Sequence, residues 1–340
     1  MSLRIGTFVM GTRGGDYAEM LEQAVRCEEL GFDAVVLAER HFRHAPLLYP
    51  SPLPVGAAIA ARTERIRIGT AGRILSLDHP IHVAEDSATL DVLSDGRLDF
   101  GITRASLDEE AHVAFSSPLE ESSGSFTEAL EIIRRAWTED SFNFEGEYFS
   151  VPEVSVQPKP VQRPHPPLYV VAVSPARLEF ASREGINAYI GAIRTPTELA
   201  ATAATYREGL AAAGHDAAAH TLSVNRFIYV SDDDERARSE FERPFAELMH
   251  ERAPDLKAAL VAKYGGVEGL TFDRMLADFC ICGGPETVAA RLREVIAATA
   301  TPYLLATLNF ATLDHDLCLR SMELFASEVM AALEPSAAPA

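Results

Sequence analysis

Charged side chains follow several short apolar segments of this chain, and one group of three could transfer protons. Glu39, Arg40 and His41 come directly after an apolar segment that ends at Ala38. A histidine takes up or releases a proton near neutral pH, so His41 is a candidate acid or base. The residues leave a second interpretation equally open, in which Glu39 and Arg40 form a structural ion pair and His41 is a satisfied polar residue.

Arg104 is a candidate ligand for an anion, because it follows the apolar segment 98–102 and Thr103. A guanidinium binds phosphate through a planar fork of N–H donors. The alternative is a surface arginine that pairs with a nearby acid, such as Asp108 or Glu109.

The stretch Ser174-Pro175-Ala176-Arg177 is a second candidate anion site. Serine suits the N-cap of a helix, and proline suits the first helical position. The N–H groups of that first turn, together with the serine hydroxyl, favour an anion. Arg177 lies in the same turn, where the helix dipole disfavours a positive charge, and a bound anion would reverse that effect.

Two glycine-containing stretches also follow apolar segments. Residues 70–73 read Thr-Ala-Gly-Arg, and small residues at a strand end would let a planar ligand approach the backbone. Tight packing of a strand on a helix is the alternative. Gly11–Gly15 reads GTRGG, which lacks the G-x-G-x-x-G spacing of a dinucleotide site. We interpret it as a loop that borders the pocket.

The elements that must position these residues are eight short apolar segments, which alternate with amphipathic stretches. This alternation predicts parallel strands with crossover helices, and eight units favour a (β/α)₈ TIM barrel with insertions over an open sheet. Barrel enzymes carry their sites at the C-terminal ends of the strands, where the candidate residues lie. The expected strands are 3–9, 34–38, 66–70, 98–102, 168–173, 188–191, 222–230 and 303–308.

We expect a single domain over residues 1–333 and a disordered tail over 334–340. Two insertions interrupt the rhythm of strands and helices. The first, about 140–167, is rich in aromatic residues around Gly146 and predicts a small hairpin. The second, about 232–275, is too long for a simple connector, and it is either an extra surface helix or a lid.

The composition limits the partners. The chain has 50 acidic and 30 basic residues and a formal net charge of -20, which would repel nucleic acid and anionic membranes. An anionic cofactor therefore needs a local cationic pocket. The four cysteines form no CxxC pair and no ligand cluster, so we expect buried thiols and no metal. Without a signal peptide or an apolar run of membrane length, a cytoplasmic protein is expected.

Four stretches of the chain resemble the bacterial luciferase-like flavin monooxygenases, especially the luciferase subunits. They occur in the order and at the spacing of that family, and with the later GHD and the terminal helix the resemblance covers almost the whole chain. The stretches are GFDAVVLAERHF, IGTAGRILSLDHPIHVAED, LSDGRLDFGITRA and PLYVVAVSPARLEFA.

The resemblance implies a (β/α)₈ barrel, a homodimer and a site for reduced flavin mononucleotide (FMN). By analogy the phosphate is held by Arg104 and by the turn that contains Val173, Ser174 and Arg177.

The resemblance also places the flavin ring near Thr103 and against Ala71-Gly72, where the family often has a non-proline cis peptide bond.

Some residues differ from those of the luciferases. Arg40 stands where they carry the first, catalytic histidine of a pair, and it cannot act as a general base. Thr103 replaces a reactive cysteine, and Val173 and Arg177 differ from the luciferase phosphate turn. These differences favour an oxygenation other than light emission.

The function that this resemblance implies is a two-component monooxygenase. It would take reduced FMN from a separate NAD(P)H:flavin reductase and use O2 to oxygenate a small organic molecule, in a reaction that belongs to secondary metabolism. Glu39, Arg40 and His41 would be its catalytic residues. Two alternatives remain: a deazaflavin-dependent oxidoreductase of the same superfamily, and a protein that binds flavin without turnover.

Overall fold

The eight predicted strands form a closed parallel barrel in the computed structural model. They follow one another in chain order around the barrel, and the pairing of β9 with β10 closes it. The (β/α)₈ fold expected from the sequence is confirmed. The barrel strands are β1 (Arg4–Val9), β2 (Ala34–Leu37), β3 (Arg67–Thr70), β5 (Leu98–Thr103), β8 (Leu168–Val171), β9 (Asn187–Ile190), β10 (Leu222–Val230) and β12 (Tyr303–Asn309).

The structure describes residues 3–9, 11, 16–42, 50–104, 109–266, 269–310 and 312–333. The predicted tail 334–340 and most of the glycine-rich loop at 12–15 lie outside these ranges.

Helices follow the strands as expected. Asp16 caps the first helix by accepting a hydrogen bond from Ala18 N at 2.7 Å, and Thr195 forms a capping box with Glu198 at the start of α7. The helices are α1 (Tyr17–Glu29), α2 (Pro52–Ala60), α3 (Pro80–Leu93), α4 (Glu109–Ala114), α5 (Ser122–Thr138), α6 (Pro175–Arg183), α7 (Pro196–Ala212), α8 (Asp234–Tyr264), α9 (Phe272–Asp278), α10 (Pro285–Thr299) and α11 (His315–Leu324), which continues into η5 (Phe325–Met330) and α12 (Ala331–Leu333). No helix in the described part of the chain combines the length and apolar character that a membrane span needs.

The chain divides into two compact units. Unit 1 comprises Met1–Val35, Ala45–Leu47 and Ala172–Ala340, and unit 2 comprises Val36–His44 and Leu48–Val171.

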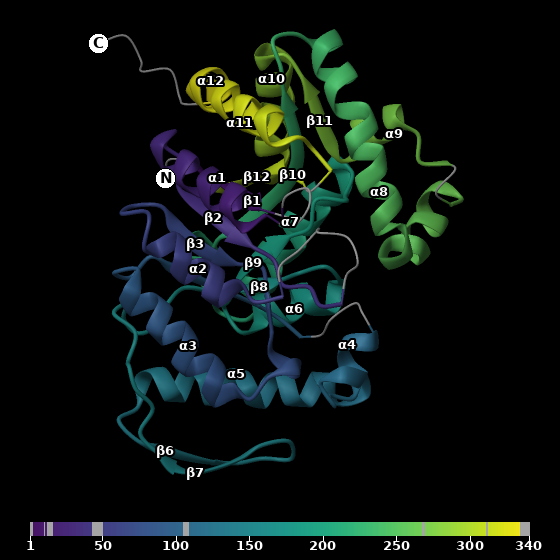
Figure 1. Cartoon of the computed structure of the whole chain (residues 1–340). Helices are drawn as coiled ribbons and strands as arrows, with labels where there is room; N and C mark the ends of the chain where they lie inside the picture. The colour runs from purple at the N-terminus through teal and green to yellow at the C-terminus, as the bar shows by residue number, and fades with distance from the viewer. Residues whose placement is uncertain are drawn as a thin grey trace. The chain divides into compact units, whose positions relative to one another are not determined.

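The first insertion contains the expected hairpin, which belongs to unit 2. Strands β6 (Phe142–Glu145) and β7 (Ser150–Val154) pair antiparallel, and the hairpin projects beyond α5 (Figure 1). The Glu128 carboxylate on α5 accepts hydrogen bonds from three successive backbone N–H groups in the turn, at 2.8–3.0 Å. One side chain on α5 therefore anchors the hairpin.

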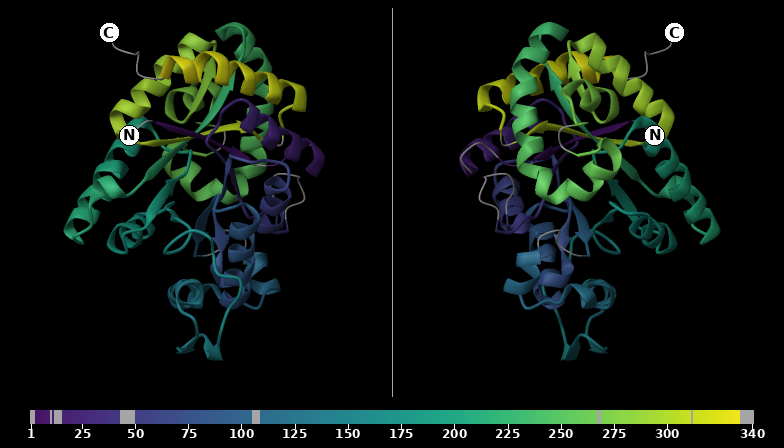
Figure 2. Two further views of the ribbon diagram at one scale, coloured as in Figure 1. Left: turned by 90° about the vertical axis from the view of Figure 1, so that its left-hand side faces the viewer. Right: turned by 90° about the vertical axis from the view of Figure 1, so that its right-hand side faces the viewer.

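The second insertion belongs to unit 1, and its first half is part of the core. The apolar side chains that α8 presents at helical spacing, Phe241, Phe245, Leu248 and Met249, are at most 2 % exposed. Phe245 packs edge-on against Phe227 of β10, with ring centroids 5.0 Å apart. This half of α8 therefore contributes to the core of unit 1, and the prediction of a lid within residues 232–275 stays a prediction. In the same unit, the yellow C-terminal helix runs beside α10 (Figure 2).

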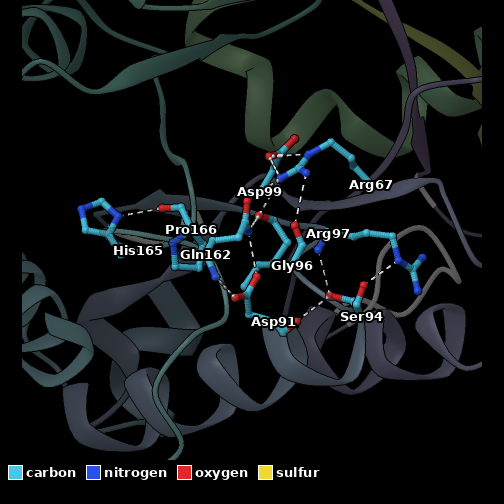
Figure 3. A network of polar contacts seen from close by, with 10 residues as sticks. Arg67, Asp91, Ser94, Gly96, Arg97, Asp99, Gln162, His165 and Pro166 are labelled. Atoms are coloured by element: carbon cyan, nitrogen blue, oxygen red, sulfur yellow. Dashed lines mark hydrogen bonds and ion pairs between the residues drawn. The ribbon is translucent and has the colours of Figure 1, made fainter.

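Buried polar side chains in unit 2 connect the start of β5 to its neighbours (Figure 3). Asp91 of α3 accepts hydrogen bonds from the backbone N–H groups of Val161 and Gln162, at 2.7 and 3.0 Å. Arg67 of β3 pairs with Asp99 of β5 at 2.6 Å. The charged residues around the LSDGR stretch therefore have a structural role.

Arg97, in the same stretch, is 9 % exposed and uses its whole guanidinium within the fold. Nε donates to the carbonyl of Ser94, and the two terminal nitrogens donate to the carbonyl of Ala60, the last residue of α2, and to that of Ile66, at 2.7–3.1 Å. These bonds satisfy carbonyl groups that the end of a helix leaves without partners.

Replacing this guanidinium should destabilise the protein strongly. In Arg97→Met the carbonyl groups lose their donor while they stay buried, and we expect a loss of about 3 kcal/mol in the free energy of unfolding. Urea denaturation measures the loss. The matched control is Arg62→Met, because the Arg62 side chain is exposed. Equal stability of the two variants would contradict the structural role of Arg97.

Candidate functional site

The Ala71–Gly72 segment of unit 2 lies at the C-terminal ends of the neighbouring strands β2, β3 and β5. The Ala71–Gly72 peptide bond is cis, as the family resemblance implied. Ala71 N donates to Leu37 O of β2 at 2.7 Å, and the Thr70 hydroxyl donates to Gly101 O of β5 at 2.7 Å. These bonds fix the Ala71–Gly72 segment between β2 and β5.

Gly72 is needed here for steric reasons. A Cβ atom on this residue would lie 2.7 Å from the carbonyl carbon of Ile102 and 2.9 Å from its oxygen. Neither atom can move aside easily, since both belong to the backbone of β5. The sequence indicated a close approach of backbone at this point, and the structure identifies the neighbouring strand as one partner.

Glu39 is the buried centre of the predicted catalytic group. Its side chain is fully buried, and its Oε1 accepts hydrogen bonds from Arg73 and from His41 Nε2, the latter at 3.0 Å. Its Oε2 accepts from Ile74 N at 3.2 Å. A carboxylate with three donors is well compensated for the loss of water.

Arg73 is the residue of this group that the sequence analysis did not single out as a site residue. It lies on the short strand β4 (Arg73–Ile74), which pairs with β5, and its guanidinium contacts Asp78 as well as Glu39. Burial lowers the pKa of Arg73, but the two carboxylates raise it more, so its pKa lies above the ordinary value. The available signal was a charge between the small and apolar residues of AGRIL, with an acid five positions later.

His41 lies at the border of this buried group. Its side chain is 11 % exposed, and its ring packs edge-on against Phe115 with centroids 4.9 Å apart. Phe42, with a positive φ of 55°, lies beside both rings and is half exposed. Arg40 is partly exposed next to them. The structure thus brings Glu39 and His41 into contact. It also places Phe42 and Phe115 against His41, which the sequence did not predict.

Arg104 follows β5 in unit 2 and is partly buried. Its Nε is buried and has no hydrogen-bond partner among the described residues. The acids proposed as alternative partners, Asp108 and the side chain of Glu109, lie outside what the structure describes. A buried donor without a partner is uncommon in proteins and is compatible with an external anion as acceptor.

The Ser174 turn belongs to unit 1. Ser174 is the N-cap of α6 and Pro175 is its first residue, as predicted, and the Ser174 side chain makes no capping hydrogen bond. Arg177 N donates to Ser174 O at 3.2 Å, so this N–H group is used within the turn.

A buried arginine supports the backbone near that turn. Arg226 of β10 is 1 % exposed and donates to the carbonyls of Ala192 and Arg194, both at 2.8 Å. Arg194 in turn donates to Val173 O at 3.4 Å. Burial, followed by the nearby Arg291 charge, lowers the pKa of Arg226 to about 10. Val173 itself is half exposed.

The model of the luciferase-like monooxygenase family matches residues 1–301 of the chain. The chain belongs to this family.

Its relatives use more than one cofactor. The chain is 28% identical over 223 residues to the oxygenase component of the flavin-dependent trigonelline monooxygenase of Acinetobacter baylyi, covering 65% of this chain and 61% of the relative. It is 35% identical over 175 residues to an F420-dependent glucose-6-phosphate dehydrogenase of Intrasporangium calvum, with 49% and 52% covered.

A solved structure extends the likeness over nearly the whole chain. The crystal structure of the monooxygenase RslO1 from Streptomyces bottropensis matches with a TM-score of 0.84 at 28% sequence identity, covering 97% of this chain and 99% of that one. This luciferase-like protein therefore shares its complete barrel with an oxygenase.

A side chain at Gly72 should disturb the site of this luciferase-like protein. In Gly72→Ala, the added Cβ would press on the β5 backbone, and we expect a loss of about 1–3 kcal/mol in the free energy of unfolding. Gly191→Ala is the matched control, because nothing lies within 4 Å of a Cβ built there. Urea denaturation of both variants checks this, and a Gly72→Ala variant as stable as the control would show that β5 can give way.

Proposed function

We propose that this chain is the oxygenase component of a two-component flavin-dependent monooxygenase, which uses reduced FMN and O2 to oxygenate a small organic substrate. Arg104 directly follows the barrel strand β5, and its buried Nε has no acceptor among the described residues. This observation carries the proposal. The trigonelline enzyme, whose name describes it as an oxygenase component, supports the need for a separate NAD(P)H:flavin reductase.

The residues of unit 2 are compatible with such a flavin. In the proposal, Arg104 binds the phosphate, and the flavin ring lies against the Ala71–Gly72 segment and Thr103. Reduced flavin, when bound, supplies the electrons that activate O2. The prediction that Val173, Ser174 and Arg177 bind the same phosphate stays a prediction, as does the homodimer.

The catalytic roles in this proposal belong to the group around Glu39. His41 holds or accepts a proton at Nδ1, the ring nitrogen that does not face Glu39. Arg40 stabilises the negative charge that develops on oxygen atoms during the reaction. Phe42 and Phe115, which pack around the His41 ring, limit the access of water to it.

A deazaflavin-dependent oxidoreductase is the second candidate, and the F420-dependent relative favours it. Such an enzyme would transfer hydride and consume no oxygen. A protein that binds flavin without turnover is the third, and it would show binding without product.

Flavin binding should depend on Arg104. Charged hydrogen bonds contribute about 1.5–3 kcal/mol each, so Arg104→Ala should weaken the affinity for reduced FMN by about ten- to a hundredfold. Anaerobic titration followed by flavin fluorescence and absorbance measures this, with Arg62→Ala as the matched surface control. Tighter binding of a deazaflavin cofactor than of FMN by the unchanged protein would favour the second candidate. Unaltered affinity in Arg104→Ala would remove the phosphate assignment.

Loss of His41 should lower the turnover rate much more than it lowers the affinity for flavin. A positioned general base contributes about 10²- to 10⁴-fold, so His41→Ala should lower substrate-dependent oxygen uptake by at least about a hundredfold while the Kd for FMN changes little. An oxygen electrode with a flavin reductase and a panel of small aldehydes and aromatic compounds provides the measurement. His250→Ala, an exposed histidine on α8, is the control. Equal uptake by both variants would leave His41 with a structural role only.

A further inference from the structure

The contacts of Glu39 determine which nitrogen of His41 carries its proton. We propose that Arg73, held by Asp78, is a positioning residue: it keeps Glu39 as a carboxylate and so fixes His41 in the tautomer with the proton on Nε2. The consequence for turnover depends on the proposed function, whereas the tautomer itself is a property of the resting protein.

The first step is the charge of Glu39. The side chain is fully buried, so it can stay ionised only with compensating donors. Arg73 supplies the positive charge on Oε1, and Ile74 N supplies a hydrogen bond to Oε2 at 3.2 Å. With both oxygens occupied by donors, Glu39 can only accept hydrogen bonds.

The second step is the position of Arg73. Its side chain is 14 % exposed, and one terminal nitrogen contacts Glu39 while the other contacts Asp78. Two carboxylates on opposite arms of a planar guanidinium restrict its rotation. Asp78 is itself partly exposed and lies at the end of the short helix η1 (Leu75–Leu77), directly before α3.

The third step is the tautomer of His41. Nε2 lies 3.0 Å from Glu39 Oε1, and an acceptor at that position requires the proton on Nε2. Nδ1 then has a lone pair and can accept a proton. The ring also packs edge-on against Phe115, with centroids 4.9 Å apart.

Loss of Arg73 should remove this control in either of two ways. If Glu39 stays ionised, its uncompensated charge favours the imidazolium form of His41, which has no lone pair to accept a proton. If Glu39 takes up a proton, it can donate to Nε2 as well as accept from it, and both tautomers become populated. The single Nε2–H form is lost in both cases.

The experiment is ¹⁵N NMR of the histidine rings of the resting, full-length protein near neutral pH. His41 is assigned by the signals that disappear in His41→Gln. We expect the neutral Nε2–H pattern in the unchanged protein, and either the imidazolium pattern or a mixture of tautomers in Arg73→Met. Arg73→Lys, which keeps the charge, should restore the original pattern. The Nε2–H pattern in a folded Arg73→Met variant would overturn the proposal.

A matched control separates this effect from general destabilisation. Arg67 also pairs with a buried carboxylate of unit 2, Asp99 at 2.6 Å, but it has no contact with Glu39 or His41 among the described residues. Arg67→Met should lower stability and leave the His41 pattern unchanged. A change of that pattern in Arg67→Met would show that loosening of the fold suffices. If Arg73→Met does not fold, Arg73→Gln, which keeps a donor but no charge, takes its place with the same expected result.

Turnover provides a second readout. In Arg73→Met we expect kcat to fall at least about tenfold, since a misplaced base loses part of its 10²- to 10⁴-fold contribution, while KM and flavin affinity change less. A change of tautomer without any flavin-dependent turnover in the unchanged protein would refute the proposed function and leave the role of Arg73 intact. A rise in KM or weaker flavin binding alone, with kcat and the Nε2–H pattern kept, would contradict the positioning role.

Discussion

The candidate site depends on the need to compensate one buried carboxylate. Glu39 is fully buried at the end of β2, where a lone charge would cost several kcal/mol. Its ion pair with Arg73 ties the residues after β2 to the short strand β4, and β4 pairs with β5. Arg73 also follows Gly72 directly in the sequence. The polar group that could carry out chemistry and the Ala71–Gly72 segment proposed to contact a planar ligand are therefore parts of one connected arrangement.

Buried charges near the N-terminal ends of these strands also need compensating partners, and there the partners belong to the structural framework of unit 2. Arg97, Asp91 and Asp99 are buried, and the hydrogen bonds of each are made to the protein itself (Figure 3). These residues join helix ends, the start of β5 and the segment that contains Gln162. Nothing in their arrangement calls for a ligand. Their charges serve the fold, and they account for much of the LSDGRLDF stretch that resembles the family.

The remaining hydrogen-bonding capacity separates the two groups of charges. The Arg97 guanidinium donates through all three nitrogens to protein oxygens, whereas Arg104 has a buried Nε without a partner in the described part of the chain. Both arginines belong to the same family-like stretch and are seven residues apart in sequence. A chain with a net charge of -20 needs such a local cation if it is to bind an anionic cofactor.

The architecture and the local capping signals could be predicted from the amino-acid sequence. Eight apolar segments in alternation with helices were sufficient to predict the barrel, because this periodicity reflects which side chains each element must bury. Helix caps such as Asp16 and Ser174 could also be predicted, since they depend on neighbours only a few residues away. The partners of the charged side chains could not be predicted in this way and became known from the folded structure. Glu39 and Arg73 are 34 positions apart, and no local rule selects Arg73 over the adjacent Arg40. The burial of Phe241 and Phe245 could not be predicted either, because helical spacing shows that a face is apolar but not what covers it. Pairing and burial over such separations are set by how the strands and helices pack, and that information lies in the whole chain.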